Sequence, residues 1–193
     1  MMINIKKHIP NTITCLNLFS GCLSCVMAFE GNYTMAAVFI YVAAVFDFLD
    51  GFAARLLKAY SAIGKELDSL ADCISFGLAP GLIMFSIFQD VSFPYMPEFF
   101  VEYVPYLAFP VFSALRLAKF NIDERQTSSF IGLPTPANSI FIASLASSLP
   151  CFFVSYGIFL VFIVLIFSYL LVAEFPMFSL KMKNLKWKEN SLR

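Results

Sequence analysis

Long apolar runs separated by short polar connections dominate the hydrophobic pattern of this sequence. Each run reaches roughly the 20 residues that a helix needs to cross the hydrocarbon core of a bilayer. Residues 1–10, in which isoleucines alternate with polar residues, predict a segment lying at the membrane surface. The pattern therefore predicts an all-α integral membrane protein of six transmembrane helices with a short N-terminal interfacial segment. The six runs are 11–29, 33–57, 64–88, 98–120, 136–156 and 158–180.

Composition supports the membrane class. Hydrophobic residues make up 60% of the chain and charged residues 13%, against about 45–50% and about 25% in soluble domains. The 13 basic and 13 acidic residues balance, so the chain lacks the basic excess that nucleic-acid binding requires. Because the connections are too short to hold another folded unit, we expect residues 1–193 to form a single membrane domain.

The basic residues indicate how the spans are oriented. All 13 fall within residues 6–7, 55–65, 116–125 and 181–193, which lie on one side of the predicted spans. The opposite connections carry acidic residues or no charge. The positive-inside rule then predicts a multi-pass protein of the cell membrane with both termini in the cytoplasm.

Four aspartates interrupt the apolar pattern where the second run ends and the third begins. Asp47 and Asp50 share one helix face, and Asp68 and Asp72 share another. The connection between the two runs is short, so the two faces should meet near the cytoplasmic end of antiparallel helices. Charges within a span are costly and adjacent carboxylates repel each other. The pattern predicts a site for hard divalent cations, magnesium or manganese with calcium as another occupant, and two such ions would suit phosphoryl transfer.

Small residues beside the aspartates support the prediction of a phosphate-binding metal site, whereas the neighbouring cations offer an alternative to it. Gly51, Ala54 and Gly64 lie on the acidic faces and would leave room for a phosphate group to approach the backbone. One alternative is a solvated helix end neutralised by nearby lysines and arginines. A second alternative is a divalent-cation transporter, although the inverted repeats and broken helices typical of transporters are not visible.

At these residues the sequence resembles the CDP-alcohol phosphatidyltransferase family. The family signature is D-x-x-D-G-x-x-A-R, eight residues, then G-x-x-x-D-x-x-x-D, and every fixed position matches. The resemblance implies six spans, metal bound by the aspartates, and Asp72 as both a metal contact and the general base. It also implies that the CDP headgroup contacts Gly51, Arg55 and Ser61. The matching residues are Asp47, Asp50, Gly51, Ala54, Arg55, Gly64, Asp68 and Asp72.

A narrower resemblance, to the membrane-embedded phosphatidylserine synthases within that family, extends along the chain. It rests on PNTITCLNLFSG at 10–21, DSLADCISFGLAP at 68–80, ALRLAKFN at 114–121 and FIGLPTPAN at 130–138. It implies that polar residues of the first span, Asn11, Thr14 and Asn17, help to bind the CDP-lipid, and that L-serine is the acceptor. The family resemblance also implies a homodimer. Glycerol phosphate or inositol phosphate remains an alternative acceptor.

Two basic residues are candidates for the acceptor side. Arg116 and Lys119 lie three residues apart near the cytoplasmic end of the fourth span, where they could bind a phosphate or a carboxylate. The alternative is that both side chains extend to the membrane surface, as basic residues at span ends commonly do.

Overall fold

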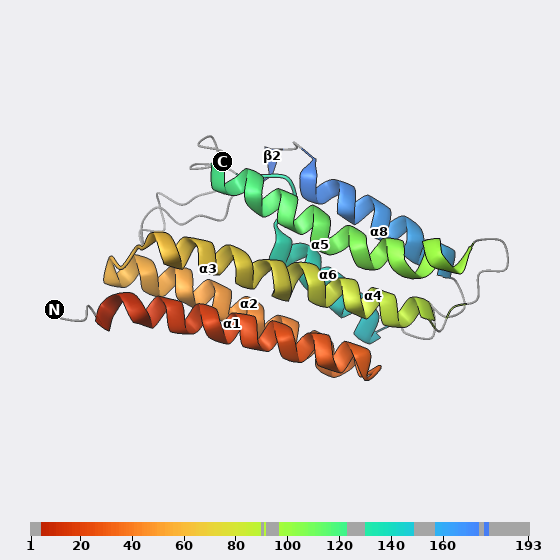
Figure 1. The fold of residues 1–193 in the computed structure, drawn as a ribbon, viewed down its shortest axis with the longest axis horizontal. Coiled ribbons are helices and arrows are strands. Elements are labelled where there is room, and N and C mark those ends of the chain that lie inside the picture. Colours follow the sequence, from red (N-terminus) through yellow and green to blue (C-terminus); the bar gives the residue numbers. More distant parts are fainter. Residues whose placement is uncertain are drawn as a thin grey trace, which may run out of the picture.

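The protein is an elongated bundle of helices. The structure, a computed structural model, describes residues 5–89, 91, 97–122, 130–148, 157–173 and 176–177. Three long rods run side by side, α5 and α8 cover one side of them, and α6 lies behind (Figure 1). The elements are α1 (Ile5–Phe29), α2 (Tyr33–Leu57), α3 (Ala62–Asp72), η1 (Cys73–Leu78), α4 (Ala79–Gln89), α5 (Glu98–Ile122), β1 (Phe130–Ile131), α6 (Thr135–Ser148), α8 (Gly157–Val172) and β2 (Pro176–Met177).

Polar caps define the two short turns that join the first three rods. The Asn32 side chain accepts a hydrogen bond from the Met35 backbone N–H at 3.1 Å and so begins α2. At the other end of α2, Lys58 adopts a left-handed conformation, and its N–H caps the last helical carbonyls. Ser61 then begins α3 by accepting from the Gly64 N–H at 3.0 Å. These tight turns make successive rods antiparallel, as the short connections predict.

The central rod is a continuous helix from Ala62 to Gln89 whose middle is a π-helix, η1. The Ala79 N–H bonds to the Ile74 carbonyl, five residues earlier, which is the π pattern. Two other helices approach η1 closely at glycines. A side chain at Gly21 of α1 would collide with Ser75, and one at Gly77 would lie 3.0 Å from Cβ of Ser113 on α5.

The ends of the later elements differ from the sequence prediction. Helix α8 ends at Val172, and Pro176–Met177 pairs with Phe130–Ile131 as a short antiparallel ladder, so the prediction of a sixth span reaching residue 180 is wrong at its end. A proline within a continuing helix would remove a hydrogen bond and clash with the preceding turn. Residues 149–156, predicted to complete the fifth span, lie outside the described residues.

The start of the chain also differs from the prediction. Residues 5–10, expected to form a separate interfacial segment, are the first turns of α1, and Pro10 lies inside that helix.

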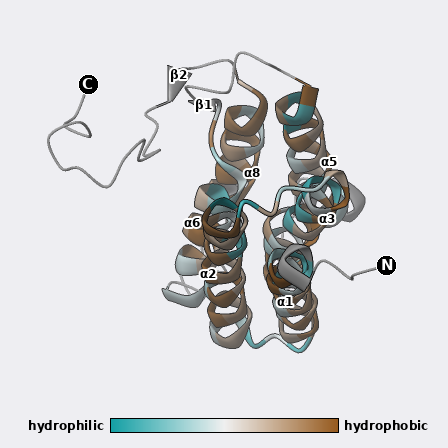
Figure 2. Cartoon of the chain, turned by 90° about the vertical axis from the view of Figure 1, so that its left-hand side faces the viewer, coloured by the Kyte–Doolittle hydropathy of each residue, from teal (hydrophilic) through white to brown (hydrophobic). Residues whose placement is uncertain are grey.

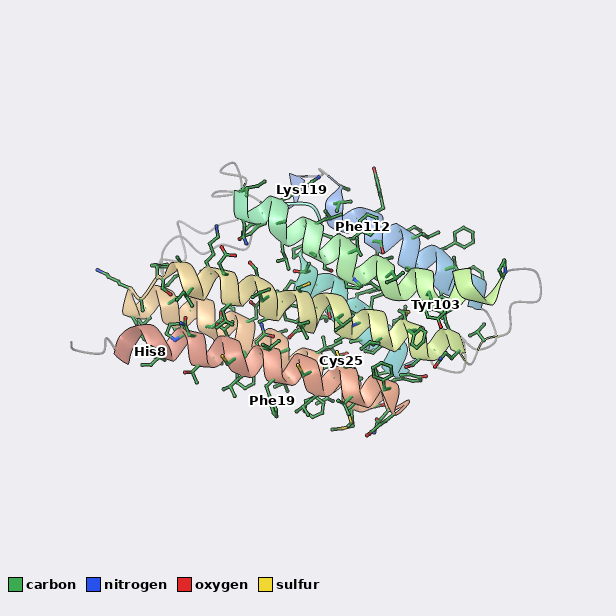
Figure 3. All side chains as sticks on the ribbon, viewed as in Figure 1. His8, Phe19, Cys25, Tyr103, Phe112 and Lys119 are labelled. Atoms are coloured by element: carbon green, nitrogen blue, oxygen red, sulfur yellow. The ribbon has the colours of Figure 1, made fainter. Side chains whose placement is uncertain are left out.

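The outside of the bundle is apolar. Large hydrophobic side chains such as Phe19, Phe48 and Leu56 are 60%, 64% and 70% exposed, and Phe19 points away from the bundle in Figure 3. Hydrophobic colouring dominates the helices in Figure 2. Among the described residues, three helices are long and apolar enough to cross a membrane, namely His8–Phe29, Tyr33–Leu57 and Ala62–Gln89. The fold is therefore all-α and of membrane-protein type.

Candidate metal centre

Three aspartates from two helices converge at the end of the bundle that holds the start of α1. Asp47 and Asp50 come from α2, and Asp68 comes from α3. One carboxylate oxygen of each lies within 4.8 Å of the others. The predicted meeting of the two acidic faces is thus confirmed. Helix α1 packs along both α2 and α3, so it braces the two acidic helices.

The residues of this cluster fit a divalent cation. All the donors are carboxylate oxygens, the ligand type that hard ions such as Mg²⁺, Mn²⁺ and Ca²⁺ prefer. Oδ1 of Asp68 is buried without a hydrogen-bond partner, as expected of an atom reserved for a ligand. The nearby Lys65 ammonium donates to the Asn121 carbonyl at 3.0 Å.

Polar side chains of α1 hold two of the four signature aspartates. The Thr14 hydroxyl donates to Oδ2 of Asp50 at 2.6 Å, and the Asn17 amide donates to Oδ1 of Asp72 at 3.3 Å. Asp72 is only 8% exposed and lies outside the group of three converging aspartates. Thr14 and Asn17, predicted to contact the CDP-lipid, are therefore placed where they orient carboxylates.

Three of the four signature aspartates converge in space, and a comparison with known families agrees with the signature. The sequence model of the CDP-alcohol phosphatidyltransferase family matches residues 7–176, which is most of the chain. The chain belongs to this family. The match includes α1, both acidic helices and the later helices, so it is not confined to the aspartate signature.

Three curated relatives show which CDP-alcohol phosphatidyltransferases this chain is similar to. The chain is 38% identical to the CDP-diacylglycerol–serine O-phosphatidyltransferase of Bacillus subtilis over 130 residues, covering 67% of this chain and 70% of that one. It is 37% identical to the enzyme of the same name from Saccharomyces cerevisiae, covering 76% and 55%. It is 33% identical to the archaetidylserine synthase of Methanothermobacter thermautotrophicus, covering 74% and 61%. The latter two matches span less than two thirds of the relatives' length.

The signature glycines of this family member serve different purposes. A side chain added at Gly51 would meet no other atom within 4 Å, whereas one at Gly64 would meet Asn11 Oδ1 and Ser61 Oγ at 2.9 Å. Gly64 therefore allows close packing of α1 against the start of α3, and Ser61 caps that helix. Open space beside the aspartates is found at Gly51.

The basic residues predicted to bind the donor or the acceptor differ in exposure. Arg55, one turn beyond Gly51 and next to the half-buried Ala54, is exposed at the end of α2. Lys119 of α5 is also exposed, and Figure 3 shows it toward the same end of the bundle as His8. Arg116 is only 7% exposed and lies near enough to Asp72 to interact with it electrostatically. Of the two acceptor candidates, Arg116 alone lies inside the bundle.

Two features of the site were missed in the sequence. Asn121, at the end of α5, donates to Ser69 Oγ at 2.8 Å and accepts from Lys65 through its carbonyl, so it ties α5 to α3. Asn138 of α6 is fully buried. A polar residue inside an apolar run was a usable signal for Asn138, whereas Thr14 and Asn17 were predicted from the family resemblance. No spacing rule links Asn121 to Ser69, since they belong to separate helices.

Replacing Gly51 with leucine is expected to weaken CDP-lipid binding by roughly tenfold or more while leaving expression close to normal. A Cβ added at Gly51 would meet no other side chain within 4 Å, and the rest of the leucine would extend into the space beside the aspartates. Calorimetric titration of the purified protein with CDP-lipid measures the effect. The matched control is Val45→Leu, an exposed position on the same helix. Wild-type affinity in Gly51→Leu would mean that this space does not receive the donor.

Proposed function

We propose that this chain transfers the phosphatidyl group of CDP-diacylglycerol, or of an ether-lipid equivalent, to the hydroxyl of L-serine. The products are phosphatidylserine, or its ether-lipid counterpart, and CMP. The observation that carries this proposal is the convergence of Asp47, Asp50 and Asp68 beside an Asp72 that α1 holds separately. The names of the curated relatives support serine as the acceptor, and the archaetidylserine synthase supports the ether-lipid option.

Divalent metal bound by the three converging aspartates would neutralise the pyrophosphate of the donor and activate its phosphorus. We propose magnesium or manganese, and two ions. Gly51 leaves the backbone of α2 open toward the bound headgroup, and the exposed guanidinium of Arg55 is suited to pair with phosphate oxygens. Thr14 fixes the Asp50 carboxylate through its 2.6 Å hydrogen bond.

Asp72 is assigned the proton-transfer role. The serine oxygen forms a bond to the phosphorus that carries the lipid, and the bond from that phosphorus to the bridging oxygen breaks, releasing CMP. The hydroxyl proton passes to the Asp72 carboxylate, whose other contact is the Asn17 amide. A ternary complex with direct attack is the simplest mechanism, because the site holds no evident covalent nucleophile among the described residues.

The bundle suggests how this reaction is arranged at the membrane. We propose six spans with both termini and the aspartates at the cytoplasmic face. The exposed lysines Lys58, Lys65 and Lys119 lie at the ends of α2, α3 and α5 that belong to this face, in agreement with the positive-inside rule. The expectation of a homodimer rests on the family resemblance.

A panel assay tests the proposed function. The purified protein is given radiolabelled CDP-diacylglycerol and manganese, with L-serine, glycerol 3-phosphate or inositol phosphate as acceptor, and CMP and lipid products are followed. We expect CMP release that depends on serine and yields phosphatidylserine. Turnover with a phosphorylated acceptor in place of serine would establish the alternative acceptor. Metal flux across liposomes without CMP release would establish the transporter.

A further inference from the structure

Among the described residues that follow Asp72 in the chain, five buried polar side chains have hydrogen-bonding atoms without a partner. They come from α5, α6 and α8, and none is more than 7% exposed. Asn138 is the extreme case, because it is fully buried and neither its amide nitrogen nor its oxygen has a partner. The atoms without partners are Ser113 Oγ, Arg116 Nε, Thr135 Oγ1, both Asn138 side-chain atoms and Ser168 Oγ.

Such a set is unusual for the interior of a bundle. Most buried polar side chains in folded proteins have hydrogen-bond partners, and an unpaired one destabilises the fold. A membrane protein has still less opportunity to satisfy such groups from solvent. Other buried side chains of this bundle do have partners, since Ser24 and Ser86 each donate to a backbone carbonyl at 2.8 Å. The five side chains therefore indicate a place that a polar ligand occupies.

Helices α5 and α6, which carry four of the five side chains, pack against η1, the segment that directly follows Asp72. Ser113 of α5 lies against Gly77 of η1, and Arg116, one turn further along α5, interacts electrostatically with Asp72. From the other side, Ser139 of α6 donates to the Ser75 carbonyl of η1 at 3.5 Å, which places α6 against the same segment.

Helix α8 is the third helix that carries one of the unpaired side chains. It packs against both α5 and α6, and the Leu133 N–H, just before α6, bonds to the Leu170 carbonyl at 3.0 Å. Ser168 lies on this part of α8. The unused hydrogen-bonding groups thus belong to α8 and to the two helices that it packs against, both of which also pack against η1 beside the proposed base.

The charges of the five side chains restrict the charge of the ligand that they could bind. Arg116 is the sole buried basic side chain among the residues whose burial the structure describes, and the other four members are neutral. A phosphorylated acceptor would call for more than one cation. One guanidinium matches a single carboxylate, and neutral hydroxyl and amide oxygens can accept from an ammonium group. This composition suits a small zwitterion that carries a hydroxyl.

We propose that Ser113, Arg116, Thr135, Asn138 and Ser168 form the binding pocket for the serine acceptor, with Arg116 on the carboxylate. The inference rests on the proposed function. It assigns acceptor specificity to a buried set that includes the neutral residues Asn138 and Thr135, and it leaves the exposed Lys119 outside the pocket.

The test replaces the polar groups with apolar ones of similar shape. Because Asn138 and Thr135 have side-chain atoms that are unpaired in the free protein, Asn138→Leu and Thr135→Val should fold with unchanged or higher thermal stability. We expect the KM for L-serine to rise by about tenfold or more, while the KM for CDP-diacylglycerol stays within about twofold of wild type. The matched control is Ser144→Ala on the same helix, whose hydroxyl bonds to the Ile140 carbonyl and to Tyr41.

Each other outcome has a definite meaning. A wild-type serine KM in both variants would overturn the pocket, as would equal rises in both KM values. If Asn138→Leu loses all turnover, equilibrium binding decides. Lost binding of radiolabelled L-serine with retained CDP-lipid binding supports the pocket, and retained serine binding overturns it. Should the wild type itself release no CMP with serine, the proposed function fails, a result that the variants do not affect.

Discussion

Replacing Asp72 with asparagine is expected to reduce turnover by about a hundred- to ten-thousand-fold, the range that a general base contributes. Affinity for the CDP-lipid should change little. Asp72 is nearly buried, accepts a hydrogen bond from Asn17, and lies outside the three aspartates that converge as a metal site. Asparagine keeps the shape of the side chain and one oxygen that can accept from Asn17, but it cannot take up the serine proton.

The comparison that separates proton transfer from metal binding is Asp72→Asn against Asp47→Asn. Calorimetric titration with CDP-lipid and the rate of CMP release are measured on both. We expect Asp47→Asn to lose donor binding together with turnover, because its carboxylate belongs to the converging group. Near-normal turnover in Asp72→Asn, or a defect confined to donor binding, would make Asp72 a plain metal ligand.

Removing divalent cations is expected to reduce CMP release by at least about a hundredfold. Three carboxylates within 4.8 Å of one another would repel the phosphates of the donor unless cations lie between them. Dialysis against chelator, followed by titration with magnesium or manganese, measures the loss and its recovery. Asp68→Asn should need a higher metal concentration for recovery than the wild type.

The matched control for the metal titration is Glu66→Gln, an exposed acidic position on the same helix. Its metal requirement should equal that of the wild type. Full turnover in excess chelator would contradict the metal centre. Recovery of Asp68→Asn at the wild-type metal concentration would remove Asp68 from the set of ligands.

The acidic site was predictable because its geometry is local. Asp47 and Asp50 lie one helical turn apart, as do Asp68 and Asp72, and a short turn connects the two helices. Helical periodicity and chain connectivity therefore suffice to bring these residues together. The apolar runs likewise predict where α1, α2 and the central rod lie, because 20 or so apolar residues in a row have few alternatives to a buried or membrane-spanning helix.

The remaining features depend on contacts between distant segments. The partner of Thr14 is 36 residues away and the partner of Asn17 is 55 residues away, so their polar character was visible but their acceptors were not. The ladder between Phe130–Ile131 and Pro176–Met177 involves two residues on each side, too few for an alternating pattern to register. Arg116 and Lys119 looked equivalent in sequence, yet three residues of helix separate an interior position from an exposed one.

The π-helix η1 in the central rod rotates the residues of α4 about the helix axis relative to those of α3. Each residue of an α-helix turns the chain by about 100°, so the wider turn at Cys73–Leu78 rotates everything after it relative to the aspartates before it. Without that shift, α4 would present a different face to α1 and α5 while Asp68 stayed in place. The angular offset between the metal-binding end of the rod and its packed end is therefore built into the backbone of η1, independently of any single side chain.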